Sequence, residues 1–412
     1  MTRRVRRLRE NRRVPTTDSS RGSLTSEDVR RHNLGLVALA LTSGPLSRSE
    51  LALETGLTRG AITSLSAELI EHEIVRESDR IAPEGRGRPK TLLELSAADV
   101  ALIIATLDAD RVEAVVSTLD GQRLARFSRR HGRPIGDPGP VVDALARVVS
   151  EALGHAAAIG RPLADLSVVV WAPVGGTPAV VLADTDLGWE RVDLIGLLQQ
   201  RLPRLSAAQI PLIADTSVAA LEEHADAGSP AHLVYLKSDS GIGGAVFADG
   251  RALTGSAGWA GMLGHLPVIP GGMLCECGQH GCLVTVAGPD VLLANAGLAD
   301  VADTEGLDAA LERFVAGVRD GRGGFVDAWA AALPHVARTL QIALLTVGAD
   351  RVVLGGYLAA FAEDIADELA RIAVRAGGAT PPQVTASRLG TDAALLGAER
   401  AARLRMIDTL LG

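Results

Sequence analysis

The chain has 412 residues, 47% hydrophobic and 22% charged, with a formal net charge of −8. This is the composition of a soluble globular protein of two or three domains, and it excludes disordered and fibrous classes. No apolar run approaches the roughly 18 residues of a membrane span, and the Arg-rich N-terminus lacks the apolar segment of a secretory signal. Three clustered cysteines without a disulfide framework predict a reducing, cytoplasmic location.

Charge is unevenly distributed along the chain. Residues 1–95 carry 17 Lys and Arg against 13 Asp and Glu, whereas the remainder carries 24 against 36. The first segment therefore has a net charge of +4 and the second of −12. A small basic module joined to a large acidic one is typical of a DNA-binding domain with a separate sensing body.

Residues 1–22 are dense in arginine and then rich in Pro, Ser and Thr, with almost nothing to bury. They predict a disordered basic arm. Two interpretations of its arginines stay open: nonspecific contact with DNA phosphates, and a solvated tail.

Residues 23–96 predict a winged helix-turn-helix domain. A first helix begins near Thr25 and ends at Ser43-Gly44-Pro45. Ser47 and Thr58 are placed to cap two further helices, and Gly56 allows a sharp turn between them. In this geometry the last helix lies in the major groove with its N-terminal residues at base edges.

The outward face of that last helix is small and polar, with Arg59, Thr63, Ser64 and Ser66 expected in solvent. A hairpin follows from Ile74-Val75 to residues 91–95, and its tip, residues 83–90, suits a basic wing in a narrow minor groove. Taken singly, a helix pair and a basic loop are ordinary features. In this order they predict duplex DNA binding by Ser47, Thr58, Arg59, Thr63, Ser64, Arg86, Arg88 and Lys90.

Residues 97–412 alternate strands and helices. Residues 101–127 predict a hairpin turning at Asp120-Gly121, and a helix follows around 141–158. Two successive α/β halves with glycine-rich turns at strand ends predict a two-lobed body with a cleft between the lobes.

All three cysteines, Cys275, Cys277 and Cys282, fall within eight residues, and His265 precedes them by ten. Three thiolates and one imidazole complete a tetrahedral Zn²⁺ shell and leave no position for water, so the predicted metal is structural. His280 is an alternative fourth ligand. Three unrelated buried thiols are the alternative to a metal site.

From about residue 25 the sequence resembles the ROK family (repressor, open reading frame, kinase), especially its winged-helix repressors. The resemblance rests on GMLGH with CECGQHGC, on SGIGGAVFADGRALTGSAGWAG, and on LGW, IADTSVAALEE and VVLGG. It implies an α/β fold of the actin, Hsp70 and sugar-kinase type behind a winged helix. It also implies His265 as the fourth zinc ligand, a sugar-related effector, and a homodimer or homotetramer.

Several positions depart from the family pattern as the resemblance gives it. The pair that meets the sugar, Asn-Asp in the family, reads Ala214-Asp215, and two sugar-contacting Glu positions hold Met262 and Val284. Losing three polar partners leaves sugar hydroxyls unpaired at roughly 1–3 kcal/mol each. The first phosphate loop, residues 106–110, has two carboxylates and no glycine, which disfavours a polyphosphate.

Asp215 is then a vestigial base candidate and no catalytic residue is predicted. The remaining candidates for ligand contact are Asp215, His265, Ser240, Gly241 and Gly243. These observations predict a DNA-binding regulator, most consistent with a repressor, whose kinase-like body is inactive. A sugar kinase and a repressor that senses a sugar through altered contacts are the alternatives, and the effector stays open.

Overall fold

The structure, a computed structural model, describes residues 26–81, 90–95, 100–108, 110–184, 187–253, 255, 258–372 and 381–410. The predicted basic arm, residues 1–22, lies outside this part of the chain. Two compact units are present, one holding the residues up to 96 together with those from 407 onward, and the other holding 97–406. Each is described by itself.

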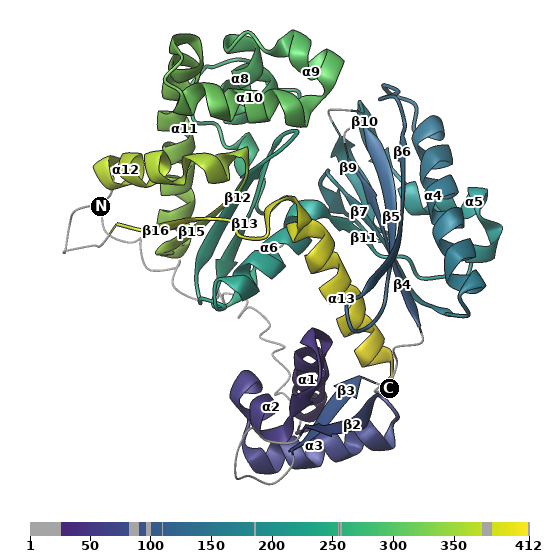
Figure 1. The fold of residues 1–412 in the computed structure, drawn as a ribbon. Helices are drawn as coiled ribbons and strands as arrows, with labels where there is room; N and C mark the ends of the chain where they lie inside the picture. The colour runs from purple at the N-terminus through teal and green to yellow at the C-terminus, as the bar shows by residue number, and fades with distance from the viewer. Residues whose placement is uncertain are drawn as a thin grey trace, which may run out of the picture. The chain divides into compact units, whose positions relative to one another are not determined.

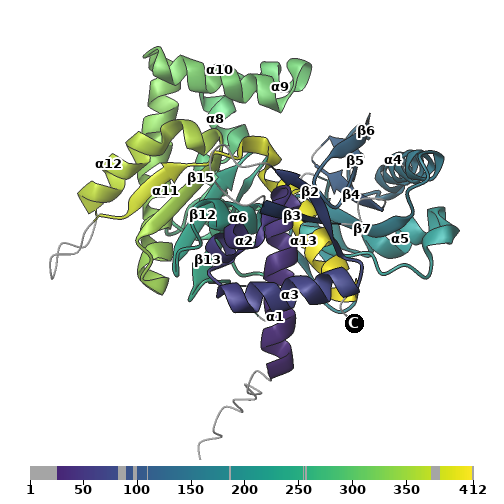
Figure 2. The same ribbon diagram turned by 60° about the horizontal axis from the view of Figure 1, so that its bottom comes forward.

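The first unit contains three helices and a small antiparallel sheet. Its helices are α1 (Ser26–Ala40), α2 (Arg48–Thr55) and α3 (Arg59–Glu71), with a short 3-10 turn at Leu41–Ser43. Its strands are β1 (Leu46–Ser47), β2 (Val75–Ile81) and β3 (Lys90–Leu95), in the order β1-β3-β2. Figure 2 shows α1 and α3 crossing within this unit.

Local sequence explains why these helices start where they do. Ser47 and Glu50 form a capping box at the start of α2, in which the Ser47 hydroxyl accepts from the Glu50 amide and the Glu50 carboxylate accepts from the Ser47 amide. The Thr58 hydroxyl accepts from the amide of Ala61 and caps α3. Gly56 ends α2 with φ of 69°, a left-handed conformation that glycine adopts without strain.

The inner faces of the three helices make a core with the hairpin, through Val37, Leu51, Ile62, Leu69 and Leu93. One expectation for α3 is wrong, because Ser66 is fully buried and donates to the carbonyl of Ile62 instead of facing solvent. The hairpin tip at 82–89 lies outside the described residues.

The second unit has two lobes, each built on a five-stranded sheet (Figure 1). The first sheet has the order β11-β7-β4-β5-β6 and is flanked by helices α4 (Gly139–Ala158) and α5 (Leu194–Arg201). Its strands are β4 (Ala101–Leu107), β5 (Arg111–Ser117), β6 (Arg123–Arg130), β7 (Leu163–Val170) and β11 (Leu212–Ala214). A small antiparallel sheet beside it holds β8 (Val174–Gly175), β9 (Val180–Asp184) and β10 (Trp189–Val192).

The single hairpin expected over residues 101–127 is a three-stranded meander. Its first turn follows β4 and its second lies near Asp120-Gly121, with β4 pairing β5 and β5 pairing β6. The first turn lacks a glycine and therefore gave no turn signal. Valine and alanine of the two central strands pack against α4 in a single apolar core.

The second lobe is built on a sheet in the order β14-β13-β12-β15-β16. Its strands are β12 (Leu233–Ser238), β13 (Ile242–Ala248), β14 (Arg251–Ala252), β15 (Arg351–Gly356) and β16 (Gln383–Ala386). Its helices are α7 (Val284–Ala287), α8 (Pro289–Asn295), α9 (Ala299–Glu305), α10 (Leu307–Arg319), α11 (Gly323–Val347) and α12 (Ala362–Ile372). Among the described residues of this unit, 3-10 segments lie at Pro203–Leu205 in the first lobe and at Leu263–His265, Tyr357–Phe361 and Gly390–Asp392 in the second.

Helix α11 is the exception to the expectation of no membrane-length apolar stretch. Among the described helices it alone is long and apolar enough, by itself, to cross a membrane by length and composition. Its buried residues, including Trp329, Val336 and Leu340, pack in the core of the second lobe. Its apolar character is therefore used at least in part for packing within the fold.

Two helices connect the lobes. Helix α6 (Asp215–Asp226) follows β11 of the first lobe and packs on β12 and β13 of the second. Helix α13 (Ala393–Leu410) follows the second lobe, and its Arg405 forms a bidentate ion pair with Asp165 at 2.9 and 3.0 Å. Arg123 of β6 pairs with Glu399 on the same helix at 3.3 Å. Asp215, the first residue of α6, therefore lies where the chain passes from the first lobe to the second.

Candidate functional site

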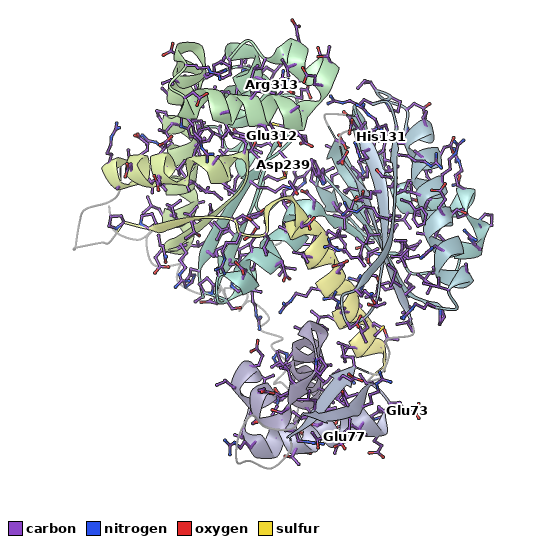
Figure 3. The ribbon with its side chains drawn as sticks, viewed as in Figure 1. Glu73, Glu77, His131, Asp239, Glu312 and Arg313 are labelled. Carbon is purple, nitrogen blue, oxygen red and sulfur yellow. The ribbon has the colours of Figure 1, made fainter. Side chains whose placement is uncertain are left out.

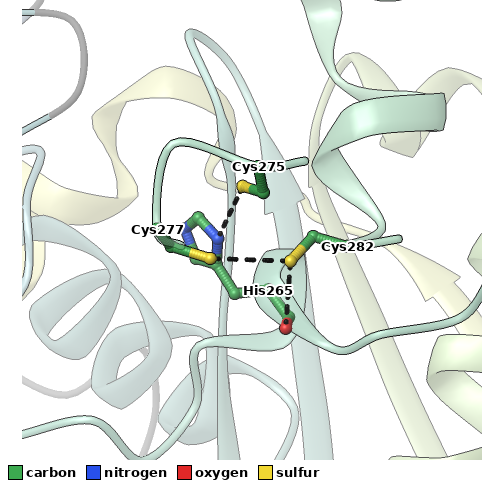
Figure 4. A group of neighbouring side chains, drawn as sticks. All are labelled: His265, Cys275, Cys277 and Cys282. Carbon is green, nitrogen blue, oxygen red and sulfur yellow. Dashed lines mark hydrogen bonds between the residues drawn. The ribbon is translucent and has the colours of Figure 1, made fainter. Parts of the chain in front are cut away.

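The predicted metal ligands come together in the second lobe. His265, Cys275, Cys277 and Cys282 offer one ligand atom each, and these four atoms lie within 4.8 Å of one another (Figure 4). Cys275 and Cys282 are buried, whereas Cys277 is exposed. The imidazole Nδ1 lies 3.5 Å from the Cys275 sulfur, and the sulfurs of Cys277 and Cys282 are 3.6 Å apart.

These separations suit a tetrahedral zinc ion. Zn–S bonds of about 2.3 Å and a Zn–N bond of about 2.0 Å would place two sulfurs about 3.8 Å apart and sulfur and nitrogen about 3.5 Å apart. The distances between His265 and Cys275 and between Cys277 and Cys282 agree with these values, and the other pairs of ligand atoms lie within 4.8 Å. Burial lowers the pKa of His265, which favours the neutral imidazole that a metal requires.

Burial and the neighbouring thiols raise the pKa of Cys282 to about 12. A second thiolate in such a site is costly unless a cation compensates for it, and a bound dication supplies that compensation. The donor set therefore fits a structural Zn²⁺.

The loop around the thiols is fixed by its own backbone. The Cys275 amide donates to the Gln279 carbonyl at 2.7 Å, and the Gly278 amide donates to the Cys275 carbonyl at 2.9 Å. Gly281 has φ of 74°, and a Cβ there would lie 1.8 Å from the Ile269 carbonyl, so only glycine fits. His280 is exposed and its Nδ1 hydrogen-bonds the Gly272 carbonyl, so His265 and not His280 joins the thiols.

The predicted DNA-contacting residues divide into two groups. Thr58, Arg59, Thr63 and Ser64 are all exposed on the first turns of α3. Ser47 is buried at 4% exposure, and its hydroxyl is engaged in capping α2. Arg86 and Arg88 lie outside the described residues, and of Lys90 the structure describes only the backbone, which pairs with Ile81.

The interlobe junction holds a charged cluster that sequence reasoning missed. Lys237, on β12, is almost fully buried, and its Nζ lies 2.7 Å from Oδ2 of Asp215 and 2.7 Å from Oδ2 of Asp239. The same ammonium lies 4.8 Å from the centroid of the Trp171 ring, which follows β7. A signal was available, since Lys237 interrupts the apolar run LVYL of a central strand.

Burial acts to lower the pKa of Lys237, but the two carboxylates outweigh it and raise this pKa above the ordinary value. Lys237 is therefore a cation, and Asp215, the vestigial base candidate, is engaged by it.

The turn that stands where a first phosphate loop was expected is closed on itself. Oδ1 of Asp108 accepts from the amides of Asp110 and Arg111 at 3.0 and 2.8 Å. Burial raises the pKa of Asp108 to about 6. The backbone donors that a phosphate would need are therefore satisfied by a side chain of the same turn.

The glycine-rich turn after β12 also has a structural use. The carbonyl of Gly241 accepts from the Ser238 hydroxyl at 2.8 Å, and the Asp239 amide donates to the same carbonyl at 3.2 Å. A Cβ on Gly243 would lie 2.4 Å from the Thr216 methyl group, so glycine allows α6 to approach β13. Ser240 is half-buried beside this turn.

Acidic side chains of both lobes lie near this junction. Burial raises the pKa of Asp308, and the charges of Asp239, Asp110 and Glu312 raise it further. Figure 3 labels Asp239 and Glu312 in the second lobe and His131 in the first. His131 contacts the carbonyl of Asp108 at 3.1 Å. A negative potential here is unfavourable for a nucleotide triphosphate.

Met262 and Val284, at the two positions where the resemblance implies sugar-contacting Glu residues, are half-buried, and their side chains offer no hydrogen-bond donor and only the weak thioether acceptor of Met262. Two cavities in the described part of the chain lie elsewhere. One of about 270 Å³ is lined by Glu223, Asp226, Ala227, Arg351, Val353, Gln383, Thr385, Ala386 and Arg388. The other, of about 520 Å³, is lined by Leu153, Ala156, Ala157, Gly160, Arg161, Pro162, Leu163, Arg204 and Leu205.

Comparison with known proteins assigns the family. The sequence model of the ROK family matches residues 107–404, which is most of the chain and includes the Cys/His cluster and the interlobe junction. The chain belongs to the ROK family. The two-lobed fold that the resemblance implied is confirmed by this match and by the solved structures it resembles.

Its relatives in this family include both regulators and kinases. A xylose repressor of Caldicellulosiruptor bescii is 24% identical over 254 residues, 60% of this chain and 61% of the repressor. The match thus spans less than two thirds of that relative. A kanosamine kinase of Amycolatopsis mediterranei is 29% identical over 259 residues, 62% of this chain and 82% of the kinase.

Among solved structures, this ROK protein is similar to a ROK family transcriptional regulator, a homologue of the E. coli MLC protein. The TM-score is 0.71 at 21% identity, covering 93% of this chain and 98% of the regulator. The likeness is one of fold, and it covers more of the chain than the second unit alone contains.

Proposed function

We propose that this ROK protein is a DNA-binding transcriptional regulator, acting as a repressor, with a kinase-like body that does not catalyse phosphoryl transfer. The observation that carries the proposal is the exposed start of α3, where Arg59, Thr63 and Ser64 face solvent on a helix capped by Thr58. The three helices and hairpin of the first unit have the order of a winged helix-turn-helix. We further propose that it acts in the cytoplasm as a homodimer or homotetramer, since paired half-sites suit a symmetric protein.

Two features support the loss of kinase activity, one at the candidate base and one at the turn where the first phosphate loop was expected. Asp215 is bound to Lys237, and the turn at Asp108 satisfies its own amides. Phosphoryl transfer depends on positioning and electrostatics, and here both the base and the phosphate-binding turn are engaged within the protein. A structural Zn²⁺ on His265, Cys275, Cys277 and Cys282 would hold the neighbouring loop in place.

A gel-shift assay on DNA from the chain's own upstream region tests the proposal. We expect retardation by the full-length protein that weakens steeply as salt is raised, because phosphate contacts release counterions. Genome-wide mapping of bound DNA would then identify the operator. Absence of retardation at moderate salt with a zinc-loaded, folded protein would contradict DNA binding.

A sugar kinase is the second candidate, favoured by the 29% identity to a kanosamine kinase and by Asp215 at the start of α6. ADP release across hexoses, amino hexoses and N-acetylhexosamines discriminates between the two. Turnover that the Asp215→Asn variant abolishes would establish the kinase. Calorimetry with the same panel separates a sugar-sensing repressor from one that does not bind sugars.

A further inference from the structure

Lys237 is unusual in this chain because lysine itself is rare. Only Lys90 and Lys237 are lysines among 41 Lys and Arg residues. The chain uses arginine almost everywhere, yet it has lysine at the most buried cationic position of the interlobe junction. An ammonium is a compact point charge with three donors, whereas a guanidinium is a planar fork that needs more room.

The strands beside Lys237 are built to admit it. Lys237 pairs with Gly243 on one side and with Gly355 on the other. A Cβ on Gly355 would lie 3.0 Å from the Cβ of Lys237 and 2.7 Å from the Tyr235 hydroxyl. Glycine on β15 therefore leaves space for the lysine side chain, whose Nζ lies 2.7 Å from Asp215.

The ammonium has close neighbours on three sides. Its Nζ lies 2.7 Å from a carboxylate oxygen of Asp215 and 2.7 Å from one of Asp239, and 4.8 Å from the centroid of the Trp171 ring. Two carboxylates and an aromatic face form the kind of environment that proteins use to bind an ammonium group. Trp171 and Asp215 follow strands of the first lobe, whereas Lys237 and Asp239 belong to the second.

We propose that Lys237 is a built-in ligand of the interlobe site and the residue that determines its specificity. The site is an ammonium cage made by Asp215, Asp239 and Trp171, and the chain fills it with its own side chain. The Lys237 ammonium lies 2.7 Å from Oδ2 of Asp215, so a neutral sugar hydroxyl would have to displace it from that oxygen. Removing the lysine opens the cage to small primary ammonium ions. This inference deepens the proposed function, because it concerns the same kinase-like body.

The first experiment replaces Lys237 and supplies a free ammonium ion in its place. We expect Lys237→Ala to lower the melting temperature and ethylammonium chloride to restore part of the loss. Tetramethylammonium, which has no N–H donor, and sodium chloride at equal ionic strength are the controls and should restore nothing. The unaltered protein should not respond to ethylammonium. Equal responses of Lys237→Ala and the unaltered protein to every salt would overturn the proposal.

A second measurement needs no variant and decides the case if Lys237→Ala fails to fold. With ¹⁵N-lysine labelling, the protein gives only two side-chain Nζ signals, and Lys90 is the internal reference. We expect one ammonium signal protected from solvent exchange, shifted by Asp239→Asn and unmoved by glucose, N-acetylmannosamine or Mg-ATP. A Lys237 signal that exchanges freely, or that moves with any of these ligands, contradicts a filled site.

These outcomes are separable from the test of the regulator. Gel-shift retardation reports on the first unit and can succeed or fail whatever the Nζ spectrum shows. A protein that shifts DNA but has an exchanging Lys237 refutes the built-in ligand alone. A protein with a protected Lys237 that binds no DNA refutes the regulator alone.

Discussion

The imidazole Nδ1 of His265 lies 3.5 Å from the sulfur of Cys275, although ten residues separate them in the chain. The backbone of the intervening loop is folded back on itself, and this brings the two ligands together. A metal held by both would tie the two ends of this loop to each other.

Replacing a thiol should therefore remove the metal and destabilise the loop. For Cys282→Ser we expect zinc content to fall from about one ion per chain to nearly none, with a lower melting temperature, because a structural site needs all four ligands. Elemental analysis of the purified protein and thermal denaturation measure the two effects. EDTA treatment of the unaltered protein should reproduce the loss of stability.

The two histidines supply a matched control for this assignment. His265→Gln should lose zinc, whereas His280→Gln should retain it, since His280 contacts the Gly272 carbonyl and not the thiols. Zinc retained by His265→Gln and lost by His280→Gln would reverse the ligand assignment.

Sequence patterns predicted the local features of this fold well. The caps at Ser47 and Thr58, the turn at Gly56 and the strand that carries Gly355-Gly356 depend on neighbours within a few residues, and all are present. The cysteine spacing likewise placed three thiols together before their geometry was known. Such features can be predicted from the sequence because the residues that interact are close together in the chain.

Features that depend on distant partners were not predictable in the same way. Lys237 lies beside Asp215 and beside Trp171, and Trp171 precedes it by 66 residues in the chain. No local sequence pattern predicts these contacts. The sequence of the turn after β4 indicates only that a phosphate loop has lost its glycines. The Asp108 carboxylate closes it by accepting two amides, a turn that needs no glycine.

Ser47 should contribute to stability rather than to DNA affinity. Ser47→Ala removes the acceptor for the Glu50 amide, and losing an N-cap costs about 1 kcal/mol of folding free energy. Denaturant unfolding of the first unit measures this cost. Ser64→Ala, at an exposed position of α3, should behave oppositely, with unchanged stability and weaker DNA binding. Weaker binding by Ser47→Ala under conditions where it is fully folded would make Ser47 a direct contact.

Arg59 should contribute directly to DNA affinity. If its guanidinium contacts a phosphate, Arg59→Ala weakens binding to all DNA sequences. The slope of the logarithm of the binding constant against the logarithm of the salt concentration then becomes shallower by about one. If it reads a base edge, the loss is about 1–3 kcal/mol and specificity at one position relaxes. Gel shifts over a salt series with specific and scrambled DNA distinguish the two results.

Arg76 supplies the matched control for Arg59. It is an exposed arginine of the same unit, on β2, and it pairs with Glu94 at 2.7 Å. Arg76→Ala removes the same charge without touching α3. Equal losses of affinity in both variants would indicate a general charge effect and not a contact made by the helix.

Asp108 should make stability depend on pH in the direction opposite to most carboxylates. Its pKa is raised from 3.8 to about 6 by burial, so the folded state keeps this proton over a range in which the unfolded state has lost it. Where the folded state binds more protons, stability falls as pH rises. The favourable contribution is complete below about pH 4 and is lost by about pH 7, at most about 3 kcal/mol for a shift of this size.

Asp108→Asn isolates this effect, because the amide oxygen can still accept from the amides of Asp110 and Arg111 while the side chain no longer titrates. We expect the difference in unfolding free energy between the unaltered protein and the variant to change by about 2–3 kcal/mol from pH 4 to pH 7, with the variant gaining relative stability. Denaturant unfolding at several pH values in constant ionic strength measures it. Parallel profiles for the two proteins across this range would mean that Asp108 titrates as an ordinary carboxyl group and that burial in the turn after β4 does not raise its pKa.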